Sequence, residues 1–177
     1  MDNSRLDEKK YPSLTVVIPV FNEEKTIEDV LKLVSYSNLV NEIVIVNDFS
    51  TDNSLGIMEK AIELILAGKP SLKIQLFNSD KNKGKGASLR KGFELANSEV
   101  IVIQDADLEY NPREYEKLIQ PIADGKADVV YGSRFIGGTH RVLYFWHYIG
   151  NKALTLLSNM LSNLNLTDME TCYKMFR

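Results

Sequence analysis

The chain has 177 residues, of which 44% are hydrophobic and 25% charged, and its formal net charge is -3 at pH 7. This size and composition are typical of one globular domain with a hydrophobic core. The slightly acidic balance argues against nucleic acid as a partner, and a single cysteine, Cys172, cannot form an internal disulfide, which favours a reducing compartment. No apolar run approaches the roughly 20 residues that span a bilayer, although contact with a membrane surface stays open.

Short apolar runs rich in β-branched residues alternate with amphipathic segments along the chain. Such runs predict buried strands, here at residues 14–20, 42–47, 72–77, 100–104 and 128–131. Helices are expected between the strands. This order predicts an α/β fold with a mostly parallel, Rossmann-like sheet and helices on both faces. In such sheets ligands bind beyond the carboxyl ends of the strands.

Three helix boundaries can be predicted from individual residues. Asn22 is expected to cap the first helix. A helix is expected to begin at Asn111-Pro112, because proline suits the first helical position. After a stretch without clear periodicity, residues 151–166 predict a last, amphipathic helix.

The two ends of the chain differ from this pattern. Residues 1–11 are polar and lack the apolar segment of a signal peptide, which predicts an N-terminal tail and a cytoplasmic protein. Residues 173–177 are typical of the interior of an element and carry no stop signal. We therefore expect residues 1–177 to be a single domain that is truncated at its C-terminus.

An acidic motif directly follows the fourth predicted strand. Asp105, Asp107 and Glu109 occupy alternate positions, which face the same way on an extended segment. Two carboxylates about 4 Å apart repel by roughly 4 kcal/mol at an effective dielectric constant near 20, and a bound Mg²⁺ or Mn²⁺ reverses that repulsion. Such an ion can also bridge a substrate diphosphate. The motif therefore favours a metal site over a solvated turn that only caps the next helix.

Two more loops carry residues that suit a nucleotide. Asp48 follows a wholly apolar strand, where its carboxylate can accept a hydrogen bond from a base; capping the next helix is the alternative, but Asp52 and Asn53 are better placed for that. The loop at residues 82–86 combines lysines with glycines, which let the backbone approach a ligand. It lies where a helix begins, a position that favours phosphate. It is not a Walker loop, and a merely solvated loop is the plainer interpretation.

Four other residues were considered as site candidates. Arg134 can contact an anionic group of a substrate, although a surface role is commoner for arginine. His140 and His147 lack the spacing of metal ligands and are interpreted as loop or packing residues. Cys172 is expected to be a buried apolar residue.

Taken together, six segments resemble family 2 glycosyltransferases with the GT-A fold, and among them the dolichyl and polyprenyl-phosphate sugar synthases. The segments are VVIPVFNEE (16–24), EIVIVNDFSTDNS (42–54), NKGKGASLRKGFELA (82–96), VIVIQDADLEYNP (100–112), ADVVYGSRF (127–135) and TDMETCYKMFR (167–177). They cover most of the chain in the expected order, and their combination is far more specific than any one of them.

The resemblance implies roles for individual residues. Nucleotide binding is implied for Pro19, Phe21, Asn22, Glu23, Asp48, Lys85, Asp105 and Ala106. Metal binding is implied for Asp105, Asp107 and Glu109, although related synthases often carry glutamine in place of Glu109. A catalytic role is implied for Asp107, Arg134, Asp168 and Glu170, and contact with the acceptor or its phosphate for Arg134 and Arg177. One departure is residues 47–50, Asn-Asp-Phe-Ser, where many relatives have Asp-Asp-Gly-Ser; it is expected to alter donor preference.

The implied reaction is inverting transfer of a sugar from a UDP-, GDP- or dTDP-sugar by a single catalytic domain, with Mg²⁺ or Mn²⁺ as cofactor. A polyprenyl or dolichyl phosphate is the expected acceptor, at the cytoplasmic face of a membrane. That acceptor is already ionised and needs no strong general base. A hydroxyl of a polysaccharide or glycolipid is the alternative acceptor, and it would need Asp168 or Glu170 as base. A non-enzymatic alternative is a receiver-like or ligand-binding α/β module, but receivers need an acidic cluster where this chain has Phe21-Asn22-Glu23.

Overall fold

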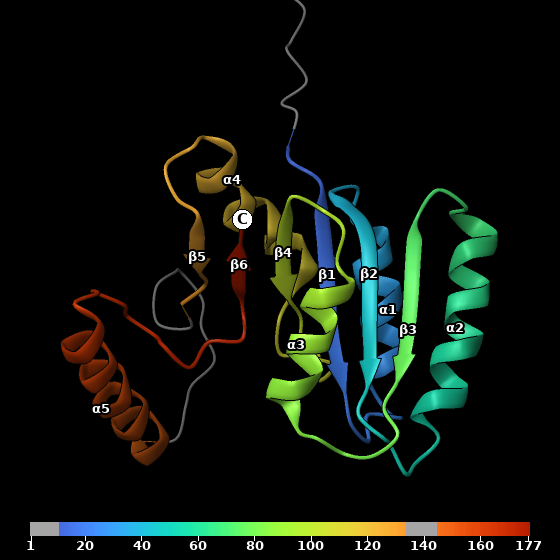
Figure 1. Cartoon of the computed structure of the whole chain (residues 1–177), viewed down its shortest axis with the longest axis horizontal. Helices are drawn as coiled ribbons and strands as arrows, with labels where there is room; N and C mark the ends of the chain where they lie inside the picture. The colour runs from blue at the N-terminus through green and yellow to red at the C-terminus, as the bar shows by residue number, and fades with distance from the viewer. Residues whose placement is uncertain (1–10, 134–144) are drawn as a thin grey trace, which may run out of the picture.

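The computed structural model describes residues 11–133 and 145–177, which form one six-stranded sheet flanked by helices (Figure 1). The strands are β1 (Leu14–Val20), β2 (Val40–Asn47), β3 (Lys73–Asn78), β4 (Val100–Ile103), β5 (Val129–Tyr131) and β6 (Lys174–Phe176). Their order across the sheet is β3-β2-β1-β4-β6-β5. Among these strands only β6 runs opposite to the others, so the predicted, mostly parallel sheet is confirmed.

Helices cover both faces of the sheet, as predicted. They are α1 (Ile27–Tyr36), α2 (Ser54–Gly68), α3 (Lys85–Leu95), α4 (Tyr115–Ala123) and α5 (Phe145–Ser162), with a 3₁₀ turn, η1 (Pro112–Glu114), before α4. The core on one face joins apolar residues of α1, α2 and α4 to alternate residues of β1 and β2. The other face packs against α3.

The central strands are buried on both faces, which explains why their sequences are continuously apolar. Ile18 and Ile45 pack against α1 and α2, while Val17 and Val44 face α3, and all four are fully buried. Burying one such side chain stabilises the fold by about 1.5–3 kcal/mol. On α3, Gly92 is required for close approach, because a Cβ built there would lie 2.3 Å from a methyl carbon of Val17.

The amino edge of the sheet is held by one buried carboxylate. Glu42 is 2% exposed and accepts hydrogen bonds from Thr15, Gln75 and, through both its backbone and its side chain, Asn97. Burial alone would raise the pKa of Glu42, but these hydrogen bonds lower it below its ordinary value. The group therefore stabilises the fold in its charged form.

Several predicted boundaries are wrong. Asn22 does not cap α1, which begins at Ile27 after Thr26. The helix predicted at residues 151–166 spans Phe145–Ser162 instead and ends where Asn163 adopts a left-handed conformation, with φ 55°. Tyr11, assigned to the polar tail, donates its hydroxyl to Glu116 and Gln120.

The remaining boundaries agree with the sequence more closely. Asn111-Pro112 starts the 3₁₀ turn that leads into α4, with the Asn111 side chain accepting from the Arg113 backbone. The acidic motif is therefore not that helix's cap. β6 was not predicted as a strand.

Candidate functional site

Three loops meet at the carboxyl edge of the parallel strands, and each contains a residue with positive φ. Asn22 follows β1, Phe49 follows β2 and Leu108 follows β4, with φ of 57°, 62° and 63°. Asparagine tolerates this conformation, whereas it is strained for a bulky residue such as phenylalanine. The Asn22 side chain accepts from the Thr51 backbone at 2.7 Å, which ties the first loop to the second.

These loops surround a pocket of about 210 Å³. It is lined by Pro19, Val20, Phe21, Glu23, Asp48, Lys85, Ser88, Asp105, Ala106 and Asp107. Most of the residues for which nucleotide binding was predicted therefore lie around one cavity. Asn22 is the exception, because its side chain binds the neighbouring loop at the Thr51 backbone and does not line the cavity.

Asp48 organises the lysine-rich loop as well as lining the pocket. It is 3% exposed, and its two carboxylate oxygens accept from the backbones of Lys83 and Gly84 at 2.9 and 2.7 Å. Asp52, by contrast, caps α2 by accepting from the Ser54 backbone and hydroxyl. The capping alternative for Asp48 is thus wrong, and the loop that opens α3 is fixed relative to β2 before any ligand binds.

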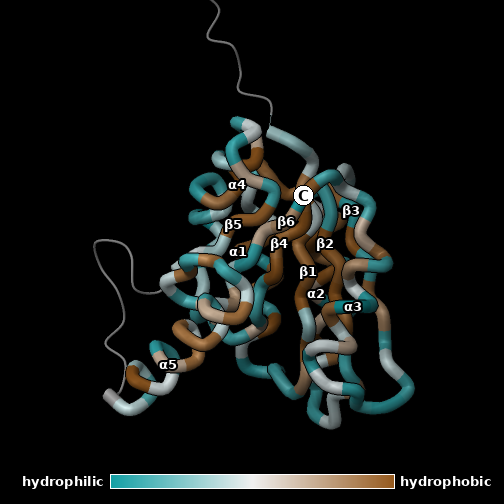
Figure 2. Tube along the Cα trace, turned by 60° about the vertical axis from the view of Figure 1, so that its left-hand side comes forward, coloured by the Kyte–Doolittle hydropathy of each residue, from teal (hydrophilic) through white to brown (hydrophobic). Residues whose placement is uncertain are grey.

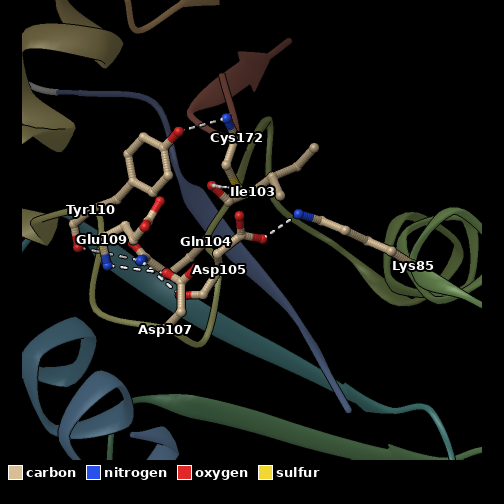
Figure 3. A network of polar contacts seen from close by, with 8 residues as sticks. All are labelled: Lys85, Ile103, Gln104, Asp105, Asp107, Glu109, Tyr110 and Cys172. Atoms are coloured by element: carbon tan, nitrogen blue, oxygen red, sulfur yellow. Dashed lines mark hydrogen bonds and ion pairs between the residues drawn. The ribbon is translucent and has the colours of Figure 1, made fainter. Parts of the chain in front are cut away.

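Lys85 reaches across the pocket to the acidic motif (Figure 3). Its ammonium nitrogen lies 2.5 Å from Asp105 Oδ1, and the Asp105 side chain is only 18% exposed. Burial would lower the pKa of Lys85, but the hydrogen bond with Asp105 raises it above its ordinary value. The pair places a permanent positive charge beside a carboxylate at the strand end, an arrangement that suits a diphosphate and its counterion.

Asp107 is exposed, lines the pocket and accepts from the Glu109 backbone at 3.0 Å. Glu109 does not line the pocket. Within the described residues, no group of three or more His, Cys, Asp or Glu side chains could hold a metal ion. Asp105 and Asp107 nevertheless fit Mg²⁺ or Mn²⁺, because such ions are usually held by one or two carboxylates together with substrate phosphates and water.

A buried amide supports the acidic motif from behind. Gln104 is fully buried, and its carbonyl oxygen accepts from the hydroxyls of Tyr115 and Tyr173 at 2.8 and 2.9 Å. Its amide nitrogen donates to the Asp105 backbone carbonyl at 3.0 Å (Figure 3). The side chain thereby fixes the direction in which the chain leaves β4, and sequence analysis missed it because a single glutamine at a strand end carries no distinctive pattern.

The second acidic pair, Asp168 and Glu170, is held by α5. The Asn151 amide nitrogen donates to Asp168 at 3.1 Å and to Glu170 at 2.8 Å. The hydroxyl of Thr155, one turn along the helix, donates to the side-chain carbonyl of Asn151 and accepts from the backbone N–H of Met169. The buried contacts of α5 are thus polar, while many of its apolar side chains are exposed.

Lys174 was not singled out by sequence analysis, and it is not among the residues that line the pocket. It opens β6, and its ammonium lies 5.3 Å from the centroid of the Tyr131 ring. The charges of Lys85, Asp168 and Asp105 are near enough to influence its pKa. The sequence offers little indication of this position, because Lys174 reaches it only when β6 pairs beside β4.

Two predicted arginines have different outcomes. Arg134 and His140 lie outside the described residues. Arg177 is placed at the opposite edge of the sheet from the pocket, where it contacts Asp128 and the Ile122 carbonyl. Arg177 therefore does not join the pocket residues, because β6 runs antiparallel and carries its end away from them, and its contact with the acceptor stays a prediction.

Cys172 lies beside the acidic motif and is buried, as expected from its apolar character. Its thiol approaches the Ile103 carbonyl, and its backbone donates to the Tyr110 hydroxyl at 3.0 Å. Burial, and after it the Asp105 carboxylate, raise the pKa of this thiol. It is therefore a packing residue, protonated at neutral pH.

The sequence profile of glycosyl transferase family 2 matches residues 15–177. Among curated proteins, the chain is 33% identical over 127 residues to the dolichol-phosphate mannosyltransferase of Pyrococcus furiosus, covering 71% of this chain and 34% of that protein. It is 29% identical over 172 residues to the UDP-N-acetylglucosamine–dolichyl-phosphate N-acetylglucosaminyltransferase of Methanococcus voltae, covering 91% of this chain and 68% of that protein. The chain thus spans about a third of the Pyrococcus relative and about two thirds of the Methanococcus relative.

Solved structures are similar in fold. The mannosyltransferase of Pyrobaculum calidifontis, in complex with GDP-Man and Mn²⁺, matches with a TM-score of 0.60 and 26% identity, covering 68% of this chain and 35% of that one. The glucosyl-3-phosphoglycerate synthase of Mycobacterium tuberculosis matches with a TM-score of 0.69 and 19% identity, covering 93% of this chain and 55% of that one. The predicted GT-A fold is confirmed. With the profile match covering nearly the whole chain, we conclude that this protein belongs to glycosyl transferase family 2.

Proposed function

We propose that this chain is the catalytic part of an inverting, metal-dependent glycosyltransferase that moves a sugar from a nucleotide-diphosphate sugar to a polyprenyl or dolichyl phosphate. The observation that carries the proposal is the pocket that gathers Phe21, Asp48, Lys85, Asp105 and Asp107 at one sheet edge. Two relatives named for transfer to dolichol or dolichyl phosphate support the acceptor class.

The donor is proposed to lie along this edge with its base toward β2 and its diphosphate toward the end of β4. Pro19 and Phe21 form an apolar wall suited to a base, and Asp48 lies on the β2 side of it. Lys85 suits the diphosphate directly, and the two aspartates suit it through a bound metal ion. When bound at Asp105 and Asp107, Mg²⁺ or Mn²⁺ would stabilise negative charge on the leaving diphosphate. The complex of the Pyrobaculum enzyme with GDP-Man and Mn²⁺ supports this arrangement.

The acceptor is proposed to approach from the β6 and β5 side. A lipid phosphate is ionised at neutral pH and can attack without a strong general base. Asp168 and Glu170 are then proposed to position the acceptor or the sugar, a task that suits carboxylates fixed by the Asn151 amide. Arg134 is proposed to contact phosphate.

Contact with a membrane surface is proposed for α5. Its exposed apolar side chains include Trp146, Met160 and Leu161, which are 78%, 71% and 90% exposed, and Figure 2 shows hydrophobic residues along part of this helix as well as in the sheet. The helix has no acidic residue and carries Lys152. Such a helix suits the interface of a bilayer. No helix in the described part of the chain has the length and hydropathy needed to cross a membrane.

The proposal is tested by incubating the purified protein with labelled UDP-, GDP- and dTDP-sugars, Mn²⁺ or Mg²⁺, and either a polyprenyl phosphate or hydroxyl acceptors. We expect a glycosylated lipid phosphate to form with one donor and only when the metal is present. Transfer to a polysaccharide or glycolipid hydroxyl, with none to the lipid phosphate, would contradict the acceptor assignment. A binding assay with each nucleoside diphosphate and Mn²⁺ checks the donor site separately.

A further inference from the structure

The side chain of Lys174 lies on the same face of the sheet as α3. Side chains alternate across a strand, so Lys174 and Phe176 project from the same face of β6. The Phe176 ring lies 6.0 Å from the ring of Phe93 on α3. Lys85 begins this helix and pairs with Asp105. The ammonium of Lys174 is therefore directed to the layer that contains the Lys85–Asp105 pair.

Lys174 is half-buried, yet no carboxylate in the described part of the chain lies within ion-pair distance of its ammonium. The π face of Tyr131 is its close contact, at 5.3 Å. Burial lowers the pKa of Lys174 below its ordinary value and the charge of Lys85 acts in the same direction, while Cys172, Asp168 and Asp105 act in the opposite direction without restoring it. A half-buried ammonium without an anionic partner is costly, so this position is electrostatically suited to an incoming anion.

The position of β6 indicates which anion. Asp48 follows β2, Asp105 follows β4 and Lys174 opens β6, and across the sheet β2 is separated from β4 by β1, while β6 lies directly beside β4. In the register, Lys174 pairs with Tyr131, the last residue of β5. Lys174 thus lies on the far side of Asp105 from Asp48, toward Asp168, with which its charge interacts.

We propose that Lys174 is a phosphate-binding residue on the acceptor side of the site, where its ammonium binds the phosphate group of the lipid acceptor. This inference rests on the proposed function and names one residue that recognises the acceptor. The donor diphosphate has the same chemistry, so the test must separate the two sources of phosphate.

The variants are Lys174→Met, which keeps the apolar stem and removes the charge, and Lys174→Arg, which keeps the charge. Lys91→Met is the matched control, because Lys91 also lies over a ring, 5.1 Å from Phe77, but pairs with Glu94 and lines a different pocket. Calorimetry measures the affinity of each protein for farnesyl phosphate and, separately, for UDP and GDP with Mn²⁺. Thermal melts check that each variant is folded.

We expect Lys174→Met to weaken binding of farnesyl phosphate by about 10- to 100-fold, the loss typical of one charge-assisted hydrogen bond. Lys174→Arg should retain most of the affinity, Lys91→Met should match the parent, and nucleoside diphosphate binding should be unchanged in all three. Transfer assays should show the same loss as a higher KM for the lipid phosphate at an unchanged KM for the donor.

Other outcomes overturn the inference in distinguishable ways. If Lys174→Met binds farnesyl phosphate like the parent, Lys174 has no role in recognising the acceptor, while the proposed function stands. If the variant loses nucleoside diphosphate binding instead, Lys174 serves the donor. If the unaltered protein neither binds farnesyl phosphate nor glycosylates a lipid phosphate, the proposed function fails and this inference fails with it.

Discussion

The region from β1 to α4 and the region from β5 onward differ in which side chains they bury and in how their charged groups are paired. In the first, apolar side chains are buried and the loop carboxylates accept hydrogen bonds from nearby backbone, as Asp48 does. In the second, α5 buries Asn151 and Thr155 and exposes apolar side chains, and Lys174 has no ion-pair partner among the described residues. The first region satisfies its polar groups within the chain, whereas the second is the region for which we propose contacts with a ligand and with lipid.

The largest effect is expected in the donor pocket. Asp107→Asn should lower the transfer rate by about 10³-fold or more, because it removes a carboxylate that would hold the metal ion against the leaving diphosphate. The variant should melt at the parent temperature, since Asp107 is exposed. Glu109→Gln is the matched control and should retain most activity, because Glu109 does not line the pocket. Full activity of Asp107→Asn in a steady-state assay would refute the pocket assignment.

A stability effect of about 3 kcal/mol is expected at the amino edge of the same region. In the parent protein, backbone and hydroxyl donors bind the Glu42 carboxylate, and Glu42→Gln replaces that carboxylate with a neutral amide. Urea unfolding should show the loss, and exposed Glu99→Gln should not. An unaltered midpoint would mean that the buried network contributes little.

The same residue predicts a dependence on pH. Because the folded state lowers the pKa of Glu42 below its ordinary value of 4.5, its stabilisation is complete above that pH and is lost as the pH falls through the folded pKa. Unfolding free energies measured between pH 7 and pH 3 should therefore fall more steeply for the parent than for Glu42→Gln. If the two proteins lost stability equally as the pH falls, the stabilising role of the Glu42 carboxylate would be contradicted.

A smaller effect is expected on the exposed face of α5. Leu161→Glu places a charge on a side chain that is 90% exposed, so it should not unfold the protein, but it should weaken binding to anionic vesicles by about tenfold. Co-sedimentation measures the binding. Activity toward farnesyl phosphate in solution should be unchanged. Undiminished vesicle binding would show that α5 does not contact the lipid.

The smallest effect is expected at Thr171, whose hydroxyl is buried without a hydrogen-bond partner among the described residues. Thr171→Val keeps the shape and removes that hydroxyl, so it should stabilise the protein by about 1 kcal/mol. Thermal unfolding checks the direction. A decrease in stability would indicate that the hydroxyl is satisfied by a bound water.

Much of the donor region was predictable because its signals are local. An apolar run followed at once by Asp105 and Asp107 predicts both a strand and the place of its acidic motif, and the structure brings both aspartates to one pocket. Asn22 was misassigned because a left-handed asparagine that bonds to a neighbouring loop has the same sequence appearance as a helix cap.

The region from β5 onward was less predictable because its contacts are long-range. β6 has three residues, too few for a period, and it forms only where β4 and β5 offer it backbone partners. The placements of Lys174 and Arg177 depend on that pairing. The helix α5 was predicted from its periodicity, but a pattern does not say which face is buried, and here the polar one is.

The insertion of β6 between β4 and β5 has a consequence for biosynthesis. A ribosome delivers β4 and β5 well before residues 174–176, so until those residues emerge the nascent sheet has an open seam with unpaired backbone groups. Closing it requires a pairing across more than 70 residues, between Ile101 and Phe176, which is slow to form. We therefore expect nascent chains halted before residue 174 to engage chaperones, and release from them to coincide with pairing of β6 between β4 and β5.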